Sequence, residues 1–310
     1  MCRSYVLVRG AVPCENVDAM KRATFDFLGM GAADPESWHR EGHSGMVQMY
    51  QSQEQWDNRQ WPRVHGAFAD LWGTPKLWVS FDMSHMKPPT RDDDTAAGGF
   101  VHWDLSRSVL ARGRHLRLQG ELLLEDMPAN SGGFQCVPRF HRDGSETVAQ
   151  AQDGDSCAVP PMESAEMEGY ELRHVTGKAG DLLIWHSFLP HGSCRNEGAR
   201  PRMMQLITMY PWDSECTFNS NYTTSSGQRA RLTLEEERQR RLSLWRQGLH
   251  VASFDSDWCE QTPFETAGFG GARKLTPSEA PPKLSALGER LLGLRLWDEQ
   301  EEAEEENRPG

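Results

Sequence analysis

The sequence lacks closely spaced cysteines, long apolar runs and any excess of positive charge. Its seven cysteines are scattered and no C-x-x-C motif occurs, which argues against a zinc ribbon and a thioredoxin-type redox pair. The odd number and wide spacing of the cysteines favour free thiols in a reducing compartment. We therefore expect a cytoplasmic protein.

Neither a membrane anchor nor a nucleic-acid surface is indicated. No run of eighteen apolar residues occurs, and the N-terminal apolar run is too short for a signal peptide. The 33 basic residues are outnumbered by 45 acidic ones, giving a net charge of −12, whereas a nucleic-acid footprint would need a basic patch. Residues 298–310 carry much of the acidic excess, and we expect this tail to be disordered.

Short apolar segments separated by glycine, proline and asparagine are typical of an all-β sandwich or barrel. We expect a β-rich domain over residues 1–225 with helical elements near its N-terminus, and a helical extension over 226–297 that packs on it. The predicted strands cover residues 5–8, 45–50, 77–81, 116–124, 134–138, 182–185 and 202–210, and the predicted N-terminal helices cover 15–28 and 63–71.

The extension is predicted to contain two helices. Thr233 and Glu236 match a capping box that opens a helix reaching Gln247. A leucine stripe over residues 284–292 predicts a second helix ending near Gly293. Neither helix could bury its apolar stripe alone. The polar insertion at 143–169 is typical of an active-site lid or a disordered loop.

Three residues in two motifs suggest a metal site. His102 and Asp104 flank Trp103, and side chains at i and i+2 of a strand share one face. His191, in the stretch Pro190-His191-Gly192-Ser193, would complete a set of two histidines and one carboxylate. That set leaves coordination positions open and is the ligand pattern of non-haem Fe(II) oxygenases.

His186 is an alternative to His191 as the second imidazole. The two are five positions apart, so on a regular strand they would face opposite ways, although Pro190 disturbs that regularity. The His-Gly-Ser context favours His191. For His115, His141 and His174, which lack a partner motif, we expect structural roles.

The motifs His102-Trp103-Asp104, Asn130-Ser131-Gly132-Gly133-Phe134, Val137-Pro138 and His191-Gly192-Ser193, followed by Arg202, occur in an order that resembles the phytanoyl-CoA dioxygenase family. The resemblance spans about residues 5–215. It implies a double-stranded β-helix (a jelly-roll, cupin-like core) and an enzyme that uses Fe(II), 2-oxoglutarate and O2. One departure is Arg139, where the family usually has a glycine after the proline.

The resemblance also assigns the cosubstrate contacts. The arginine that holds the far carboxylate of 2-oxoglutarate lies eleven residues after the second histidine, which favours Arg202 over Arg200. Ser193 is expected to contact the same carboxylate. Gln119, on a neighbouring strand, is a further candidate contact, with a purely structural role as the alternative.

The leading interpretation is therefore a 2-oxoglutarate-dependent dioxygenase with His102, Asp104 and His191 as metal ligands, hydroxylating or otherwise oxidising a small organic molecule. Succinate and CO2 would be the products formed from the cosubstrate. A non-catalytic ligand-binding β-barrel is the alternative, and a zinc hydrolase is a weaker one, since two histidines and a carboxylate also bind zinc. Asp104 argues against a halogenase, which needs that position vacated for chloride.

Overall fold

The structure, a computed structural model, describes residues 5–40, 43, 45–91, 101–103, 118–140, 168–213, 222–223, 229–230, 233–246 and 281–298. Its centre is a large antiparallel sheet with the strand order β1-β8-β5-β10-β4-β2. These strands are β1 (Tyr5–Val8), β2 (Met46–Val47), β4 (Ser84–Lys87), β5 (Leu118–Leu123), β8 (Leu182–His186) and β10 (Arg202–Leu206).

A smaller antiparallel sheet lies beside the large one, with β6 (Phe134–Cys136) between β7 (Arg173–His174) and β9 (His191–Ser193). His102 forms a single β-bridge to β9 and so extends this sheet by one position. From β4 onward the chain passes between the two sheets repeatedly: β5, β8 and β10 join the large sheet, whereas His102, β6, β7 and β9 join the small one. The expected mainly β, double-stranded β-helix fold is confirmed.

Strand alternation gives each strand of the large sheet two different faces. On β5, Leu122 belongs to the main apolar core, which also contains Phe68 and other residues of the helices. Leu123, its neighbour, packs with Leu183 and Phe134 in a second cluster between the two sheets. The inward face of β5 therefore also carries Gln119 and Glu121, both of which are buried.

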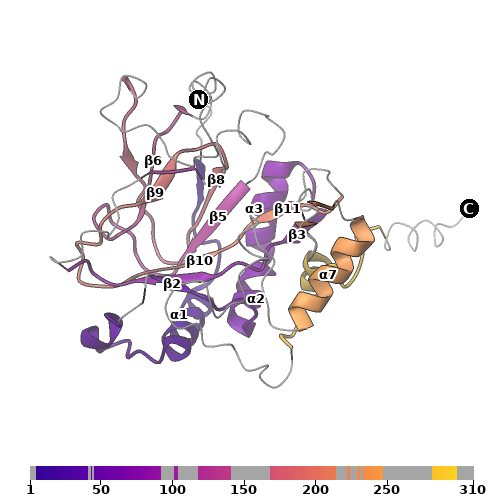
Figure 1. Cartoon of the computed structure of the whole chain (residues 1–310), viewed down its shortest axis with the longest axis horizontal. Helices are drawn as coiled ribbons and strands as arrows, with labels where there is room; N and C mark the ends of the chain where they lie inside the picture. The colour runs from indigo at the N-terminus through magenta and orange to yellow at the C-terminus, as the bar shows by residue number, and fades with distance from the viewer. Residues whose placement is uncertain are drawn as a thin grey trace, which may run out of the picture.

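Three N-terminal helices cover the outer face of the large sheet: α1 (Cys14–Leu28), α2 (Gln53–Arg59) and α3 (Pro62–Trp72). In Figure 1, α1 and α2 lie below the strands and α3 lies beside β5. As predicted, α1 ends at Gly29, whose φ of 62° is left-handed. A short 3-10 helix, η1 (Pro35–Trp38), follows.

The C-terminal helices α7 (Leu234–Arg246) and α9 (Ala286–Leu292) confirm the two helices expected in the extension. Thr233 and Glu236 exchange capping hydrogen bonds, and α9 ends at Gly293. Figure 1 shows α7 on the side of the molecule opposite β6 and β9. None of the helices in the described ranges is long and apolar enough to cross a bilayer.

The single strand predicted over residues 202–210 is wrong, because the chain changes sheets within it. After β10, the amide of Ile207 still donates to the carbonyl of Gly120, at 2.9 Å, but β11 (Met209–Pro211) pairs with β3 (Leu77–Val79). Gly120 permits this close crossing, since a Cβ there would lie 2.7 Å from the Ile207 carbonyl oxygen. A separate hairpin joins β12 (Tyr222–Thr223) and β13 (Arg229–Ala230).

Candidate metal centre

Backbone pairing brings His102 and His191 together. The amide of His102 donates to the carbonyl of His191 at 2.8 Å, and the reverse bond is 3.0 Å. Residues opposite each other in a sheet carry their side chains on the same face, and the two imidazole centroids are 5.0 Å apart. The two predicted histidine ligands therefore meet at one point inside the fold.

The surroundings of His191 fix its ring. Its Nδ1 lies 2.9 Å from the carbonyl oxygen of Leu189. Because a carbonyl oxygen only accepts, Nδ1 carries a hydrogen, and in the neutral ring Nε2 keeps its lone pair, which is the arrangement typical of metal-binding histidines. Phe134 stacks on the ring at 5.5 Å and 12°, and Trp185 packs against it at 5.1 Å. The buried imidazole is thus oriented before any ligand binds.

Asp104, the predicted carboxylate ligand, lies outside the described residues. Within the described ranges, no three histidine, cysteine, aspartate or glutamate side chains come together as a metal site. Trp103 is buried, donates from Nε1 to the Phe188 carbonyl at 3.1 Å and packs against Phe140. It thus fills the space next to His102, as the alternation of the motif predicts.

The rival histidines have other surroundings. His186 ends β8, where its Nδ1 accepts a hydrogen bond from the Phe188 amide at 3.1 Å and its ring meets the Phe188 ring. His174 is exposed on β7. His115 and His141 lie outside the described residues. The geometry therefore favours His191 as the partner of His102.

Arg202 is buried at the start of β10, on the same strand face as Met204. Its Nη2 donates to Glu121 Oε2 at 2.8 Å, whereas its buried Nε has no hydrogen-bond partner within the described residues. Arg200 is exposed and pairs with Glu125 at 3.2 Å. A buried guanidinium with donor capacity to spare fits a carboxylate ligand, so the geometry favours Arg202 over Arg200.

Glu121 also lies at this site, although no motif of the sequence marks it. Its Oε1 is buried and has no hydrogen-bond partner within the described residues. Burial raises the pKa of Glu121, while the ion pair with Arg202 acts in the opposite direction. A charged residue in the middle of the apolar segment 116–124 was the signal that could have identified it.

His85 is a second unexpected neighbour of Arg202. It lies on β4 opposite Met204. Burial lowers the pKa of His85 to about 3, and the nearby charges of Arg202 and Lys87 act in the same direction. His85 is therefore neutral at physiological pH and adds no charge to the surroundings of Arg202.

The two weaker candidates lie on the expected strands. Gln119 is buried on β5, opposite Trp185 and two residues before Glu121, so it shares the inward face with that carboxylate. Ser193 is half-buried on β9, opposite Phe134 and two residues after His191. Their contact with a cosubstrate remains a prediction.

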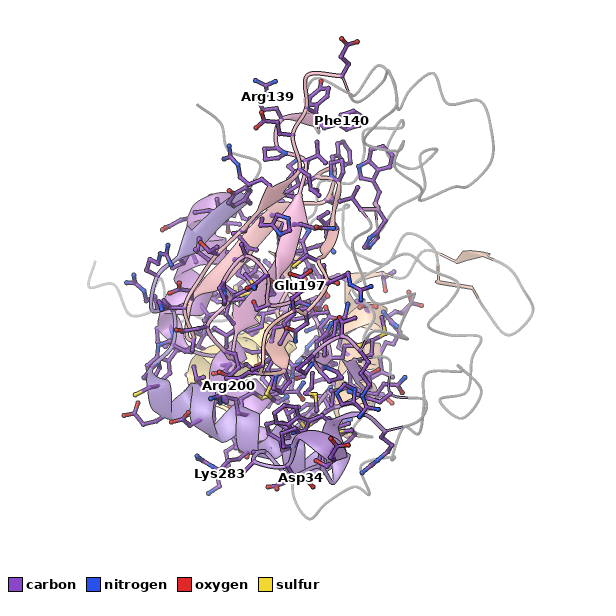
Figure 2. All side chains as sticks on the ribbon, turned by 90° about the vertical axis from the view of Figure 1, so that its left-hand side faces the viewer. Asp34, Arg139, Phe140, Glu197, Arg200 and Lys283 are labelled. Atoms are coloured by element: carbon purple, nitrogen blue, oxygen red, sulfur yellow. The ribbon has the colours of Figure 1, made fainter. Side chains whose placement is uncertain are left out.

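The turn after β6 lies at one end of the molecule, where Figure 2 shows Arg139 and Phe140 side by side, away from Arg200. Arg139 has a φ of 74°, which is the left-handed region that glycine adopts most easily. Phe140 is buried against Trp103 and Tyr170. The turn therefore keeps the backbone conformation of a glycine although an arginine occupies it.

Two named proteins are similar to this chain in sequence. The chain is 26% identical over 96 residues to "Putative phytanoyl-CoA dioxygenase" of Dictyostelium discoideum, a match that covers 31% of this chain and 28% of that protein. It is 27% identical over 231 residues to "Ava biosynthesis cluster protein O" of Aspergillus versicolor, covering 66% of this chain and 74% of the relative.

Among solved structures, the epimerase SnoN in complex with Fe3+, alpha ketoglutarate and nogalamycin RO matches 74% of this chain and 91% of its own, with a TM-score of 0.51 and 17% identity. At that identity the match supports the fold alone. A model of the phytanoyl-CoA dioxygenase family matches residues 4–204. The chain therefore belongs to the phytanoyl-CoA dioxygenase family, an oxygenase family that uses Fe(II), 2-oxoglutarate and O2.

Proposed function

We propose that this protein is a dioxygenase that hydroxylates, or otherwise oxidises a C–H bond of, a small organic molecule and converts 2-oxoglutarate to succinate and CO2. The observation that carries the proposal is the His102–His191 pair, with the Nδ1 of His191 committed to the Leu189 carbonyl. Two imidazoles held in this way suit Fe(II).

The residues present fit the metal and the cosubstrate. His102 and His191, together with Asp104, would hold Fe(II) and leave positions open for 2-oxoglutarate and O2. The bound iron supplies oxygen activation, which no side chain can provide. Arg202 would bind the far carboxylate of 2-oxoglutarate, because its buried Nε has donor capacity to spare within the described residues.

The protein itself contributes orientation and exclusion of water. Phe134 and Trp185 enclose the His191 ring, and Leu123, Leu183 and Leu189 belong to the same apolar cluster between the sheets. A dry, rigid wall strengthens the electrostatic contacts made inside it and keeps the reactive centre from side reactions with water.

For the substrate we favour a secondary metabolite. Support comes from the Aspergillus versicolor relative, which is named as a biosynthesis cluster protein, and from the SnoN structure, which is a complex with nogalamycin RO. Both observations concern other proteins. They indicate which class of molecules to test first, and experiment must identify the substrate.

The first test is cosubstrate binding at the metal. Under anaerobic conditions, Fe(II) and 2-oxoglutarate should give the wild-type protein a weak visible charge-transfer band. His102→Ala should abolish the band, and the control His186→Ala should keep it, because His186 is engaged with Phe188. A wild-type protein that binds neither iron nor 2-oxoglutarate would rule out the proposal.

The second test identifies the reaction. Incubation with metabolite extracts, aerobically and with Fe(II) and 2-oxoglutarate, should release succinate and yield a metabolite heavier by one oxygen. Formation of succinate, even without an oxidised product, would exclude a non-catalytic role. Binding of 2-oxoglutarate without any succinate would favour the ligand-binding barrel instead.

A further inference from the structure

Arg202 and Glu121 form a buried ion pair whose charges would no longer balance if a dicarboxylate bound to Arg202. Both side chains are almost wholly enclosed, with 7% and 1% of their surfaces exposed, and their charges compensate each other across a 2.8 Å ion pair. The far carboxylate of 2-oxoglutarate, bound at Arg202, would bring a second negative charge beside Glu121. Two carboxylates that share one buried cation cannot both ionise easily.

Few other groups can compensate that charge. The inward strands around Glu121 supply Arg202 from β10, His191 from β9, and His85 and Lys87 from β4. His85 stays neutral, since its pKa is about 3. Lys87, the last residue of β4, lies opposite Arg202 in the backbone register. Its side chain is half-buried. Among these groups, Glu121 is the carboxylate, and it is hydrogen-bonded directly to Arg202.

The geometry also leaves room for a proton. Only Glu121 Oε2 is used by Arg202, and Oε1 is buried with no hydrogen-bond partner within the described residues. A buried acceptor without a partner is costly, whereas a protonated Oε1 could donate to a ligand oxygen. Burial already raises the pKa of Glu121, which favours this protonation.

We propose that Glu121 takes up one proton from solvent when the far carboxylate of 2-oxoglutarate binds Arg202, and then donates a hydrogen bond from Oε1 to the ligand. This inference rests on the proposed function. The net charge around Arg202 is then the same before and after binding. The affinity for 2-oxoglutarate should therefore fall as the pH rises, by up to about tenfold per pH unit where Glu121 is ionised in the free protein.

The test compares two ligands on the Fe(II)-loaded protein under anaerobic conditions. 2-Oxopentanoate has the chain length and the metal-chelating end of 2-oxoglutarate but lacks the far carboxylate. Calorimetric titrations between pH 7 and 9, in buffers of different ionisation enthalpy, count the protons bound with each ligand. We expect up to about one more proton for 2-oxoglutarate than for 2-oxopentanoate. Titration of the metal ligands affects both ligands alike and cancels in the difference.

Glu121→Gln should bind 2-oxoglutarate with no excess proton and with little dependence on pH. Glu125→Gln is the matched control, because Glu125 pairs with Lys21 and Arg200 and is outside the Arg202 pair; it should behave as the wild type. Binding of 2-oxopentanoate by each variant shows that the variant has folded, and the wild-type comparison stands even if Glu121→Gln does not fold.

Equal proton uptake for the two ligands in the wild-type protein would overturn the role of Glu121 and leave the proposed function intact. Failure of the wild-type protein to bind either ligand would overturn the proposed function itself. The two failures are therefore distinguishable in one set of titrations.

Discussion

Arg139 adopts a backbone conformation that is unfavourable for a residue with a side chain. Family resemblance predicts a glycine after Pro138, and the structure gives Arg139 a left-handed φ of 74°. An L-residue adopts that region at a cost of about 1 kcal/mol. The arginine side chain lies over the Tyr170 ring, at 5.9 Å, so the turn that bears Phe140 is retained with an added cation–π contact.

At position 139, glycine should therefore be more stabilising than alanine. We expect Arg139→Gly to raise the free energy of unfolding by about 0.5–1 kcal/mol relative to Arg139→Ala, because both lose the Tyr170 contact and only glycine relieves the backbone. Urea denaturation measures the difference. Equal stability of the two variants would show that the turn is not strained.

At Arg202, the contribution to stability can be measured separately from the proposed binding of 2-oxoglutarate. Arg202→Met leaves the buried Glu121 carboxylate without its cation and should cost about 3–5 kcal/mol. The double variant Arg202→Met/Glu121→Leu removes both charges and should recover most of that loss. Urea denaturation measures stability, and titration with 2-oxoglutarate should find weak binding in both variants. A double variant no more stable than the single one would contradict this account.

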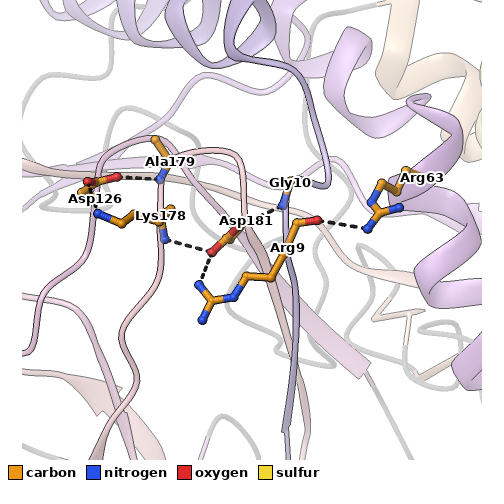
Figure 3. A network of polar contacts seen from close by, with 7 residues as sticks. All are labelled: Arg9, Gly10, Arg63, Asp126, Lys178, Ala179 and Asp181. Atoms are coloured by element: carbon orange, nitrogen blue, oxygen red, sulfur yellow. Dashed lines mark hydrogen bonds and ion pairs between the residues drawn. The ribbon is translucent and has the colours of Figure 1, made fainter.

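At the scale of elements, Asp181 attaches the end of β1 to the turn before β8 (Figure 3). Its carboxylate accepts hydrogen bonds from Arg9 Nη1 at 2.6 Å, the Gly10 amide at 2.9 Å and the Lys178 amide at 2.9 Å. Only 4% of the Asp181 side chain is exposed. Asp126, nearby, accepts from Lys178 and Ala179 but is 57% exposed.

Asp181 should contribute much more than Asp126 to the free energy of unfolding. Asp181→Ala leaves two amides without their acceptor in a partly buried turn, so we expect a loss of about 2–3 kcal/mol in unfolding free energy. Asp126→Ala breaks bonds that water can replace, and its loss should stay below about 1 kcal/mol. Chemical denaturation measures the loss of unfolding free energy in each variant. Similar losses would contradict the assigned role of Asp181.

Elements with strong local signals were predictable from the sequence, and those defined by distant partners were not. The helix of residues 14–28 has apolar periodicity and a terminal glycine, and its prediction is confirmed. Strand β7 has two exposed residues and exists through its pairing with β6. The split after Leu206 follows from an exchange of partner strands, which no local pattern records.

At the scale of the whole molecule, the candidate site was likewise predictable where a motif marks its residues and not where distant strands bring them together. His102 and His191 belong to recognisable motifs, so their meeting could be expected. Glu121 and His85 acquire their significance only because β5 and β4 both lie beside β10. Asp104 is outside the described residues, and its role as a ligand stays a prediction. Motif order thus predicted that His102 and His191 lie together, whereas the electrostatics around Arg202 required the sheet order.

The predicted helical extension and the barrel share one core. Leu242 of α7 and Leu291 of α9 lie in the same apolar cluster as Phe68 and Val79. Arg241 is fully buried in α7 and donates to the Tyr210 hydroxyl and to backbone carbonyls, among them that of Val79 at 2.7 Å. We therefore propose that residues 226–297 form an extension that cannot fold apart from the barrel.

Calorimetry should then find one cooperative transition for the full chain, with equal calorimetric and van't Hoff enthalpies. Arg241→Met removes the donor to buried acceptors and should lower the stability of that whole transition by about 3 kcal/mol. The control Arg246→Met, at an exposed position near the end of α7, should change it little. Two separate transitions, or an effect of Arg241→Met on only part of the heat absorbed, would mean that the extension unfolds independently, because a shared core must melt as a unit.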